Sequence, residues 1–226
     1  MSRNQFLLGI VVVAVIVLGV AAWYVMGGSG SDSATATATT AATGGNPMAA
    51  DPEDRTLGNP KAKIVAIEYA APMCPHCKHF NEEGIPVLKS QYIDTGKVFY
   101  IFRVFPIGQA DVAAESLARC LPADNYFAFI DQLYRNQEKW DPEYGVQDVE
   151  TQLVAQARIA GMSADQAEAC MHDQAKNARV MAVSDDAQKR FGVSGTPTFV
   201  INGVTQTAGA QWPEIKKALD SLLAKK

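Results

Sequence analysis

Ile64-Val-Ala-Ile-Glu-Tyr-Ala-Ala-Pro-Met-Cys74-Pro-His-Cys77 is the stretch that decides the fold of this chain. Residues 64–70 are rich in Val, Ile and Tyr, which predicts a strand. Pro75 suits the first position of a helix, where no N–H donor is needed, so we expect a helix over residues 74–93. The stretch therefore sets two cysteines at a junction between a strand and a helix.

Downstream of this junction the pattern changes twice. Residues 98–105 form an apolar run that predicts a second strand. From residue 109 to about 190, Ala, Gln, Glu and Asp dominate and apolar residues recur at helical spacing, so we expect four or five helices there. Ser163 and Gln166 fit a capping box at the start of one of these helices.

The C-terminal part returns to β-structure. Asn202-Gly203 stands between the apolar runs 198–201 and 204–207, and this pair favours the type I′ turn of a hairpin because both residues adopt positive φ. A last helix is predicted over residues 213–224. The order favours an α/β fold in which the first two strands pair in parallel through a right-handed crossover and the hairpin adds antiparallel strands.

The N-terminal region has a separate character. Residues 6–26 carry no charge, and as a helix they would extend roughly 30 Å, the thickness of a bilayer's hydrocarbon core. Arg3 precedes this run and the next basic residue is Arg55, so the positive-inside rule places the body of the protein outside the cytoplasm. We expect residues 1–26 to be a single transmembrane anchor, with a cleaved signal peptide as the alternative.

Composition divides the rest of the chain. Residues 27–55 begin with a long run of Gly, Ser, Thr and Ala and are expected to be a flexible linker. Residues 56–226 are expected to fold as one domain, with a helical insertion at about 108–190. The linker shows no heptads, which favours a monomer. The net charge is −4 without any basic block, so we expect no nucleic-acid partner.

Cys74 and Cys77 carry the chemistry of this sequence. Unpaired amides and the macrodipole at a helix N-terminus stabilise an anion, so we expect the pKa of the Cys74 thiol to be lowered. Cys77 would be the more buried, resolving thiol, and His76 adds a polar or cationic group beside the thiolate. Stabilising the reduced thiolate makes the corresponding disulfide a stronger oxidant.

A metal site is the alternative interpretation of this pair. Zinc would need two further ligands, and the candidates Cys120, Cys170 and His79 show no paired spacing. A copper-handling protein would need Met or His clustered beside the pair, where only Met73, His76 and His79 are close. We therefore expect no metal.

Two motifs carry a family resemblance. Cys74-Pro-His-Cys77 resembles the active-site motif of DsbA-type proteins, and Gly192-Val-Ser-Gly-Thr-Pro197-Thr-Phe resembles the thioredoxin-superfamily segment with a cis-proline. The likeness covers roughly residues 56–226 and is to the membrane-anchored or exported DsbA-like proteins of bacteria. It implies a thioredoxin-like fold with an inserted all-helical domain.

The resemblance also implies a function. It implies a thiol–disulfide oxidoreductase, without a cofactor, that introduces disulfides into exported reduced polypeptides. Such a protein would sit at the bacterial inner membrane with its catalytic domain in the periplasm, and a membrane partner would reoxidise it. A disulfide isomerase or reductase with the same core is the alternative.

Individual residues receive roles from the same resemblance. A cis Pro197 would present the backbone of Thr196 to a substrate peptide, whereas a trans proline opening an edge strand is the alternative. Glu68 stands six residues before Cys74, where DsbA-like proteins place an acid beneath the resolving cysteine, and it would accept the proton of Cys77. The alternative is a glutamate that faces solvent on an edge strand.

Cys120 and Cys170 lie on separate predicted helices of the insertion. Two cysteines in an oxidising compartment usually pair, and some DsbA-like proteins carry a second disulfide, so we expect a structural bridge. Two buried free thiols are the alternative.

Overall fold

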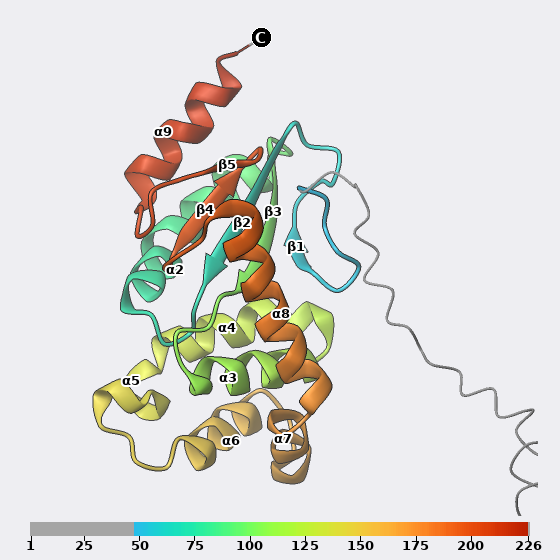
Figure 1. The fold of residues 1–226 in the computed structure, drawn as a ribbon, viewed down its shortest axis with the longest axis vertical. Coiled ribbons are helices and arrows are strands. Elements are labelled where there is room, and N and C mark those ends of the chain that lie inside the picture. The colour runs from blue at the N-terminus through green and yellow to red at the C-terminus, as the bar shows by residue number, and fades with distance from the viewer. Residues whose placement is uncertain (1–47, 226) are drawn as a thin grey trace, which may run out of the picture. The chain divides into compact units, whose positions relative to one another are not determined.

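A five-stranded mixed sheet lies at the centre of the structure, a computed structural model that describes residues 48–225 (Figure 1). Its strands are β1 (Arg55–Leu57), β2 (Ile64–Ala70), β3 (Val98–Val104), β4 (Thr198–Ile201) and β5 (Val204–Thr205). The strand order is β1-β3-β2-β4-β5, so β2 is central. It pairs in parallel with β3 and antiparallel with β4.

The β4–β5 hairpin adopts the predicted turn. Asn202 and Gly203 have φ values of 48° and 84°, the left-handed conformation that a type I′ turn requires at both positions. The Asn202 side chain also accepts a hydrogen bond from the backbone N–H of Val65 at 2.8 Å. The turn therefore fastens the hairpin to β2 as well as reversing the chain.

The helices are α2 (Pro75–Leu88), α3 (Gln109–Cys120), α4 (Tyr126–Arg135), α5 (Gln137–Trp140), α6 (Val149–Ile159), α7 (Ala164–Met171), α8 (Gln174–Phe191) and α9 (Trp212–Leu223). A π-helical turn, Lys89–Ile93, continues α2. The insertion between β3 and β4 thus holds α3–α8 among the described residues, more helices than the four or five predicted. The difference arises at α5, whose four residues are too few to show a helical period.

Side chains of β2 alternate between two apolar layers, as the pleat of a strand requires. Ile64 and Ala66 belong to the larger core, which also contains residues of α2, α9 and the insertion. Ile67 and Tyr69 belong to a second core together with Ala187 of α8. Figure 1 shows α8 crossing in front of the strands. β2 is therefore covered on both faces.

The packed domain begins before residue 56, earlier than predicted. Met48 is buried in the second core. The Asp54 carboxylate, which is almost wholly buried, pairs with the Arg103 guanidinium at 2.6 Å. β1 then adds an antiparallel edge strand to β3. Residues 48–55 therefore pack against the sheet, although their polar composition favours a linker.

The predicted anchor, residues 1–26, and most of the predicted linker lie outside the described residues. Within residues 48–225, every helix is too short or too polar to cross a bilayer.

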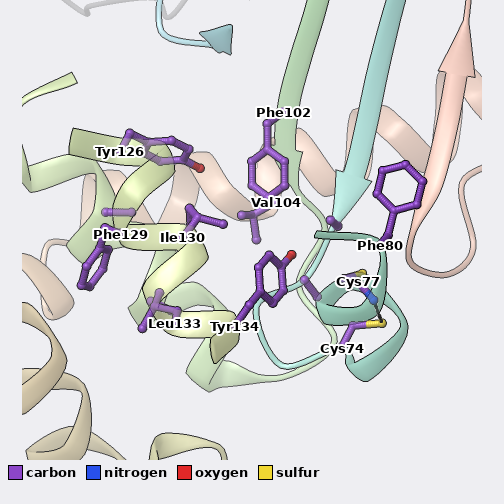
Figure 2. Close-up of a cluster of buried hydrophobic side chains, with 14 of the residues drawn as sticks. Cys74, Cys77, Phe80, Phe102, Val104, Tyr126, Phe129, Ile130, Leu133 and Tyr134 are labelled. Carbon is purple, nitrogen blue, oxygen red and sulfur yellow. Dashed lines mark hydrogen bonds between the residues drawn. The ribbon is translucent and has the colours of Figure 1, made fainter. Parts of the chain in front are cut away.

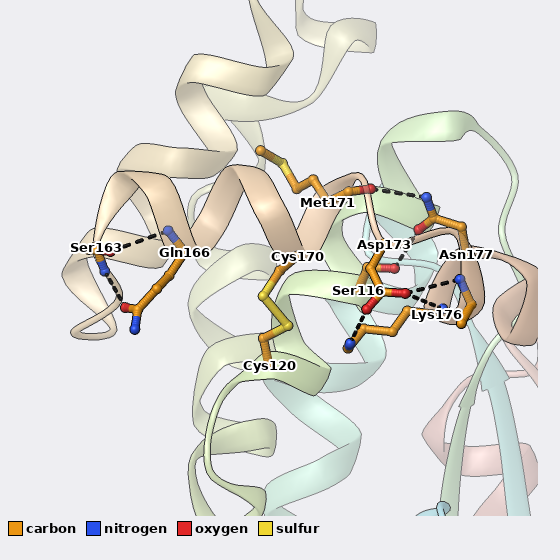
Figure 3. The surroundings of a disulfide bond; sticks show 10 residues. Ser116, Cys120, Ser163, Gln166, Cys170, Met171, Asp173, Lys176 and Asn177 are labelled. Atoms are coloured by element: carbon orange, nitrogen blue, oxygen red, sulfur yellow. Dashed lines mark hydrogen bonds and ion pairs between the residues drawn. A yellow bond between two sulfur atoms is a disulfide. The ribbon is translucent and has the colours of Figure 1, made fainter.

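The C-terminal ends of α3 and α7 are joined by a disulfide between Cys120 and Cys170, with the two Cα atoms 6.3 Å apart (Figure 3). At the start of α7, the backbone N–H of Gln166 donates to the Ser163 hydroxyl. The Gln166 side chain in turn accepts from the Ser163 backbone N–H, which completes the predicted capping box.

Candidate active site

The junction between β2 and α2 presents Cys74 as the N-cap residue of the helix. Pro75 occupies the first helical position, and the backbone N–H of Cys77 donates to the Cys74 sulfur at 3.4 Å (Figure 2). The side chain of Cys74 therefore caps the helix N-terminus, the place where backbone N–H groups lack intrahelical partners. Both cysteines are free thiols, so the structure represents the reduced dithiol.

The two thiols differ strongly in acidity. Hydrogen bonding from the Cys77 side chain lowers the pKa of Cys74 from 9.0 to about 6, although burial opposes this shift. The Thr196 side chain and the backbone amides of Cys77 and His76 add to the lowering. Burial raises the pKa of Cys77 well above 9.0, and the neighbouring Cys74 adds to the effect. Cys77 is fully buried, whereas the adjacent His76 is exposed. A thiolate thus forms at Cys74 while Cys77 keeps its proton.

The loop before β4 lies against Cys74. The peptide bond between Thr196 and Pro197 is cis. The Cys74 thiol donates to the backbone carbonyl oxygen of Thr196 at 3.4 Å. The loop and the helix start, which are 122 residues apart in the chain, therefore form one site.

Glu68 lies on the central strand with 2% of its surface exposed, so the edge-strand alternative does not hold. Burial raises the pKa of its carboxyl group from 4.5 to about 8, although a hydrogen bond from the Tyr100 hydroxyl at 2.6 Å opposes the shift. The charge of Glu68 contributes to the raised pKa of Cys77, and that of Cys74 to the raised pKa of Glu68. The acid and the dithiol thus share one poorly solvated space.

The helical insertion holds the loop that precedes α2. The fully buried Asp111 carboxylate of α3 accepts the backbone N–H of Met73 at 2.7 Å, together with those of Ile107 and Gly108 at 2.8 and 3.1 Å. From α5, the Gln137 side-chain amide donates to the carbonyl oxygens of Pro72 and Cys74, on either side of Met73. The insertion is therefore in direct contact with the site.

Sequence patterns single out neither Asp111 nor Gln137, and Tyr100 also lacks a signal of its own. Asp111 occupies the third position of α3, where acidic residues are common, so a systematic search of helix starts would find it. Tyr100 lies on the β3 strand predicted to pair with that of Glu68. Gln137 has no such signal because it acts across 65 residues of sequence.

Metal ligands do not gather within the described residues 48–225. No group of three His, Cys, Asp or Glu side chains there is arranged to hold a metal ion. Cys120 and Cys170, the candidate additional zinc ligands, are joined to each other in the insertion.

Comparison with known families agrees with this geometry. A family model described as Thioredoxin, Thioredoxin_4, matches residues 50–221, which is most of the chain. The chain belongs to this thioredoxin family.

This Thioredoxin_4 chain also resembles individual bacterial proteins. A Rickettsia bellii protein that carries the name of a protein-disulfide oxidoreductase is 33% identical over 174 residues, or 76% of this chain and 66% of that protein. A Bacillus cereus protein named for disulfide bond formation, protein D, is 30% identical over 186 residues, or 80% of this chain and 84% of that protein. The match spans 61–66% of the rickettsial relatives' own length, just under two thirds.

Solved structures show the same relationship. The crystal structure of alpha-DsbA1 from Wolbachia pipientis matches with a TM-score of 0.70 and 30% identity, covering 78% of this chain and 94% of that one. The Thioredoxin_4 chain is therefore DsbA-like, and the predicted thioredoxin-like fold with inserted helices is confirmed.

Among the predicted site residues, Cys74, Cys77, Glu68 and the Thr196–Pro197 bond meet at the start of α2. Pro75 and His76 lie exposed at its rim, while Cys120 and Cys170 stand apart in the insertion.

Proposed function

We propose that this chain is a thiol–disulfide oxidoreductase that oxidises dithiols in reduced polypeptides through Cys74 and Cys77. The observation that carries the proposal is the difference in acidity between the two sulfurs, with the pKa of Cys74 about 6 and that of Cys77 far higher. At neutral pH the reduced site holds a thiolate beside a thiol. Because the folded protein stabilises that reduced form, its disulfide is a strong oxidant.

The reaction proceeds by two exchanges. A substrate thiolate attacks the Cys74 sulfur of the oxidised protein, the Cys74–Cys77 bond breaks, and Cys77 leaves with the electron pair. A second substrate thiolate then attacks the substrate sulfur of the mixed disulfide, and Cys74 leaves as a thiolate. Two electrons pass from the substrate to the protein, and no cofactor is needed. The low pKa of Cys74 favours the second step because a less basic thiolate leaves faster.

Glu68 would donate a proton to Cys77 and accept it back in the reverse reaction. With its pKa at about 8, Glu68 is mainly protonated at neutral pH, so it can give a proton to Cys77 as that sulfur leaves. In the reverse exchange the same carboxylate would take the proton of Cys77 when that thiol attacks the mixed disulfide. Tyr100, which donates to the carboxyl group, would keep it oriented.

The substrate chain would bind beside the cis bond. Thr196 is only partly buried, and its carbonyl lies at Cys74, so an extended peptide can pair with this backbone by strand addition. Exposed Pro75 and His76 would border the same contact. Main-chain pairing depends little on side chains, which suits a protein that acts on many reduced polypeptides.

The compartment follows from the chemistry and from the N-terminal sequence. Disulfides persist outside the cytoplasm, and the uncharged run at residues 6–26 would export the domain or anchor it in the inner membrane of a bacterium. We place the catalytic domain in the periplasm or its extracytoplasmic equivalent, as a monomer. A membrane protein would reoxidise the Cys74–Cys77 dithiol after each cycle.

Equilibration of residues 48–226 with glutathione buffers, combined with oxidation of a reduced two-cysteine peptide, tests the proposal. We expect a reduction potential closer to the value of about −120 mV for DsbA than to the value of about −270 mV for thioredoxin. A potential near that of thioredoxin, with poor peptide oxidation, would replace the oxidase with a reductase.

A further inference from the structure

We infer that Gln137 is a positioning residue for Cys74: its side-chain amide, delivered by the helical insertion, fixes the peptide backbone that holds the Cys74 sulfur at the start of α2. The inference rests on the proposed role of Cys74. It makes the insertion a determinant of thiol chemistry in addition to any contact that it makes with substrates.

The contacts are specific to the active-site loop. Gln137 Nε2 donates to the carbonyl oxygen of Pro72 at 2.6 Å and to that of Cys74 at 3.3 Å. The Cys74 carbonyl also accepts the N–H of Lys78 at 3.0 Å, the first hydrogen bond of the helix. One side-chain amide thus bridges the last turn of the loop and the first turn of α2.

The orientation of this amide is fixed by its surroundings. Both neighbours of Nε2 are carbonyl oxygens, which only accept, so the NH2 end must face them. Gln137 is fully buried, and its Oε1 has no partner among the described residues. Both hydrogen bonds of this buried amide group thus go to the active-site loop, so its removal takes a donor from two carbonyl oxygens there.

Hydrogen bonds within α5 and between α5 and α4 also hold the backbone of Gln137 in place. Its backbone carbonyl accepts the N–H of Asp141 at 2.9 Å. Trp140, at the end of the same short helix, is fully buried and donates its indole N–H to the Leu133 carbonyl oxygen at 2.9 Å. α5 is therefore anchored to α4, so the amide is presented to the loop from a fixed support.

The expected consequence is electrostatic. The donor end of the Gln137 amide lies at the Cys74 peptide, where its positive pole favours a thiolate. Without it, the Lys78 N–H alone holds the Cys74 carbonyl, so the peptide is held less tightly in the geometry in which the sulfur accepts the Cys77 N–H. Loss of the positive pole and loss of the backbone restraint would each lower the thiolate fraction of Cys74. The oxidised protein would then be a weaker oxidant.

The test uses Gln137→Met, which keeps the side-chain length but removes the donor, in the full chain. We expect the equilibrium constant with glutathione to shift about fivefold toward a less oxidising protein, which is ~20 mV at about 30 mV per tenfold change for two electrons. The pKa of Cys74 should rise from about 6 in parallel. Gln137→Ala also removes the donor and should move both quantities in the same direction, and it decides the question if the methionine variant does not fold.

Gln156→Met is the matched control. Gln156 is also buried in the insertion, and its side chain accepts a hydrogen bond from Gln132 at 3.1 Å, away from the loop. The Gln156→Met substitution should lower thermal stability but leave the glutathione equilibrium and the pKa of Cys74 unchanged. The inference is overturned if the Gln137 variants change only stability, or if Gln156→Met shifts the equilibrium equally. An ordinary pKa for Cys74 in the unmodified protein would instead refute the proposed function.

Discussion

Cys74 and Cys77 lie three residues apart at the start of α2, whereas Cys120 and Cys170 lie 50 residues apart and join α3 to α7. The first pair is reduced in the structure, and its sulfurs have opposite shifts in pKa. The second pair is a disulfide on two helices of the insertion. The same side chain thus meets two different environments.

This difference teaches that placement, not the presence of cysteine, determines the role. At the start of α2 a thiolate is stabilised by the dithiol partner and by amide donors, which prepares it for exchange. A loop of three residues constrains the unfolded chain little, so a bridge there adds little stability. The Cys120–Cys170 bridge closes a loop that contains three further helices and restricts the unfolded chain far more.

Replacing single sulfurs of the first pair should have the largest effect. Cys74→Ser removes the attacked sulfur and should abolish oxidation of a reduced peptide. Cys77→Ser keeps that sulfur but lacks the resolving thiol. When it is mixed with an oxidised peptide, its Cys74 thiolate opens the peptide disulfide and the resulting mixed disulfide should accumulate. Mass spectrometry of the quenched reaction measures both results, and peptide oxidation by Cys74→Ser at the original rate would contradict the comparison.

Removal of the second bridge should affect stability and leave the chemistry intact. The double variant Cys120→Ser/Cys170→Ser should lose about 4 kcal/mol of unfolding free energy, the chain-entropy value for a 50-residue loop. Urea unfolding measures this loss. The potential of the Cys74–Cys77 pair, measured below the unfolding transition, should stay the same. A shifted potential would mean that the two pairs are coupled.

Glu68→Gln sharpens the contrast between the two thiols of the active pair. It should slow peptide oxidation about 10²-fold at neutral pH, the lower end of what general acid–base catalysis contributes. The unmodified protein should lose this advantage as the pH rises through about 8, where Glu68 loses its proton. Stopped-flow measurement across pH checks the profile, and equal profiles for the two proteins would remove Glu68 from the mechanism.

The raised pKa of Glu68 also predicts how the stability of this variant changes with pH relative to the unmodified protein. The pKa of Glu68 is raised from 4.5 to about 8 in the folded protein, so the contribution of its protonated form is fully present below pH 4.5. That contribution is lost as the pH rises from 4.5 through about 8. Glutamine does not ionise, so the Glu68→Gln protein does not lose stability in this way. Its free energy of unfolding relative to that of the unmodified protein should therefore increase across that interval.

Ser163→Ala should have the smallest effect of these variants. It removes one half of the capping box at the start of α7, the helix that carries Cys170 (Figure 3). We expect a loss of about 1 kcal/mol of unfolding free energy. Peptide oxidation should not change, and calorimetry with a parallel activity assay distinguishes this local effect from a disturbance of the active site.

Local chemistry explains which parts of the fold could be predicted from the sequence. The helix start at Cys74, the Asn202–Gly203 hairpin and the Ser163 capping box each depend on residues within a few positions of one another. Their turn and cap preferences are strong enough to survive in any context. The burial of Glu68 was predictable for a related reason, because a central strand between two helical layers leaves no exposed face.

Long-range contacts explain what could not be predicted. Gln137 meets the loop across 65 residues and Asp111 meets it across 38, and neither residue type signals such a partner. The packing of residues 48–55 depends on the buried pair between Asp54 and Arg103, which are 49 residues apart. β1 has only three residues and is too short to show an alternating pattern.

Titration of the reduced domain by the ultraviolet absorbance of its thiolates tests the central claim most directly. Ionisation of Cys74 should appear with a pKa of about 6, and this transition should be absent from Cys74→Ser and retained in Cys77→Ser, with an altered midpoint because the Cys77 hydrogen bond is the main cause of the shift. A single transition near the ordinary value of 9.0 would show that the start of α2 does not activate the sulfur, and the oxidase mechanism would fall with it.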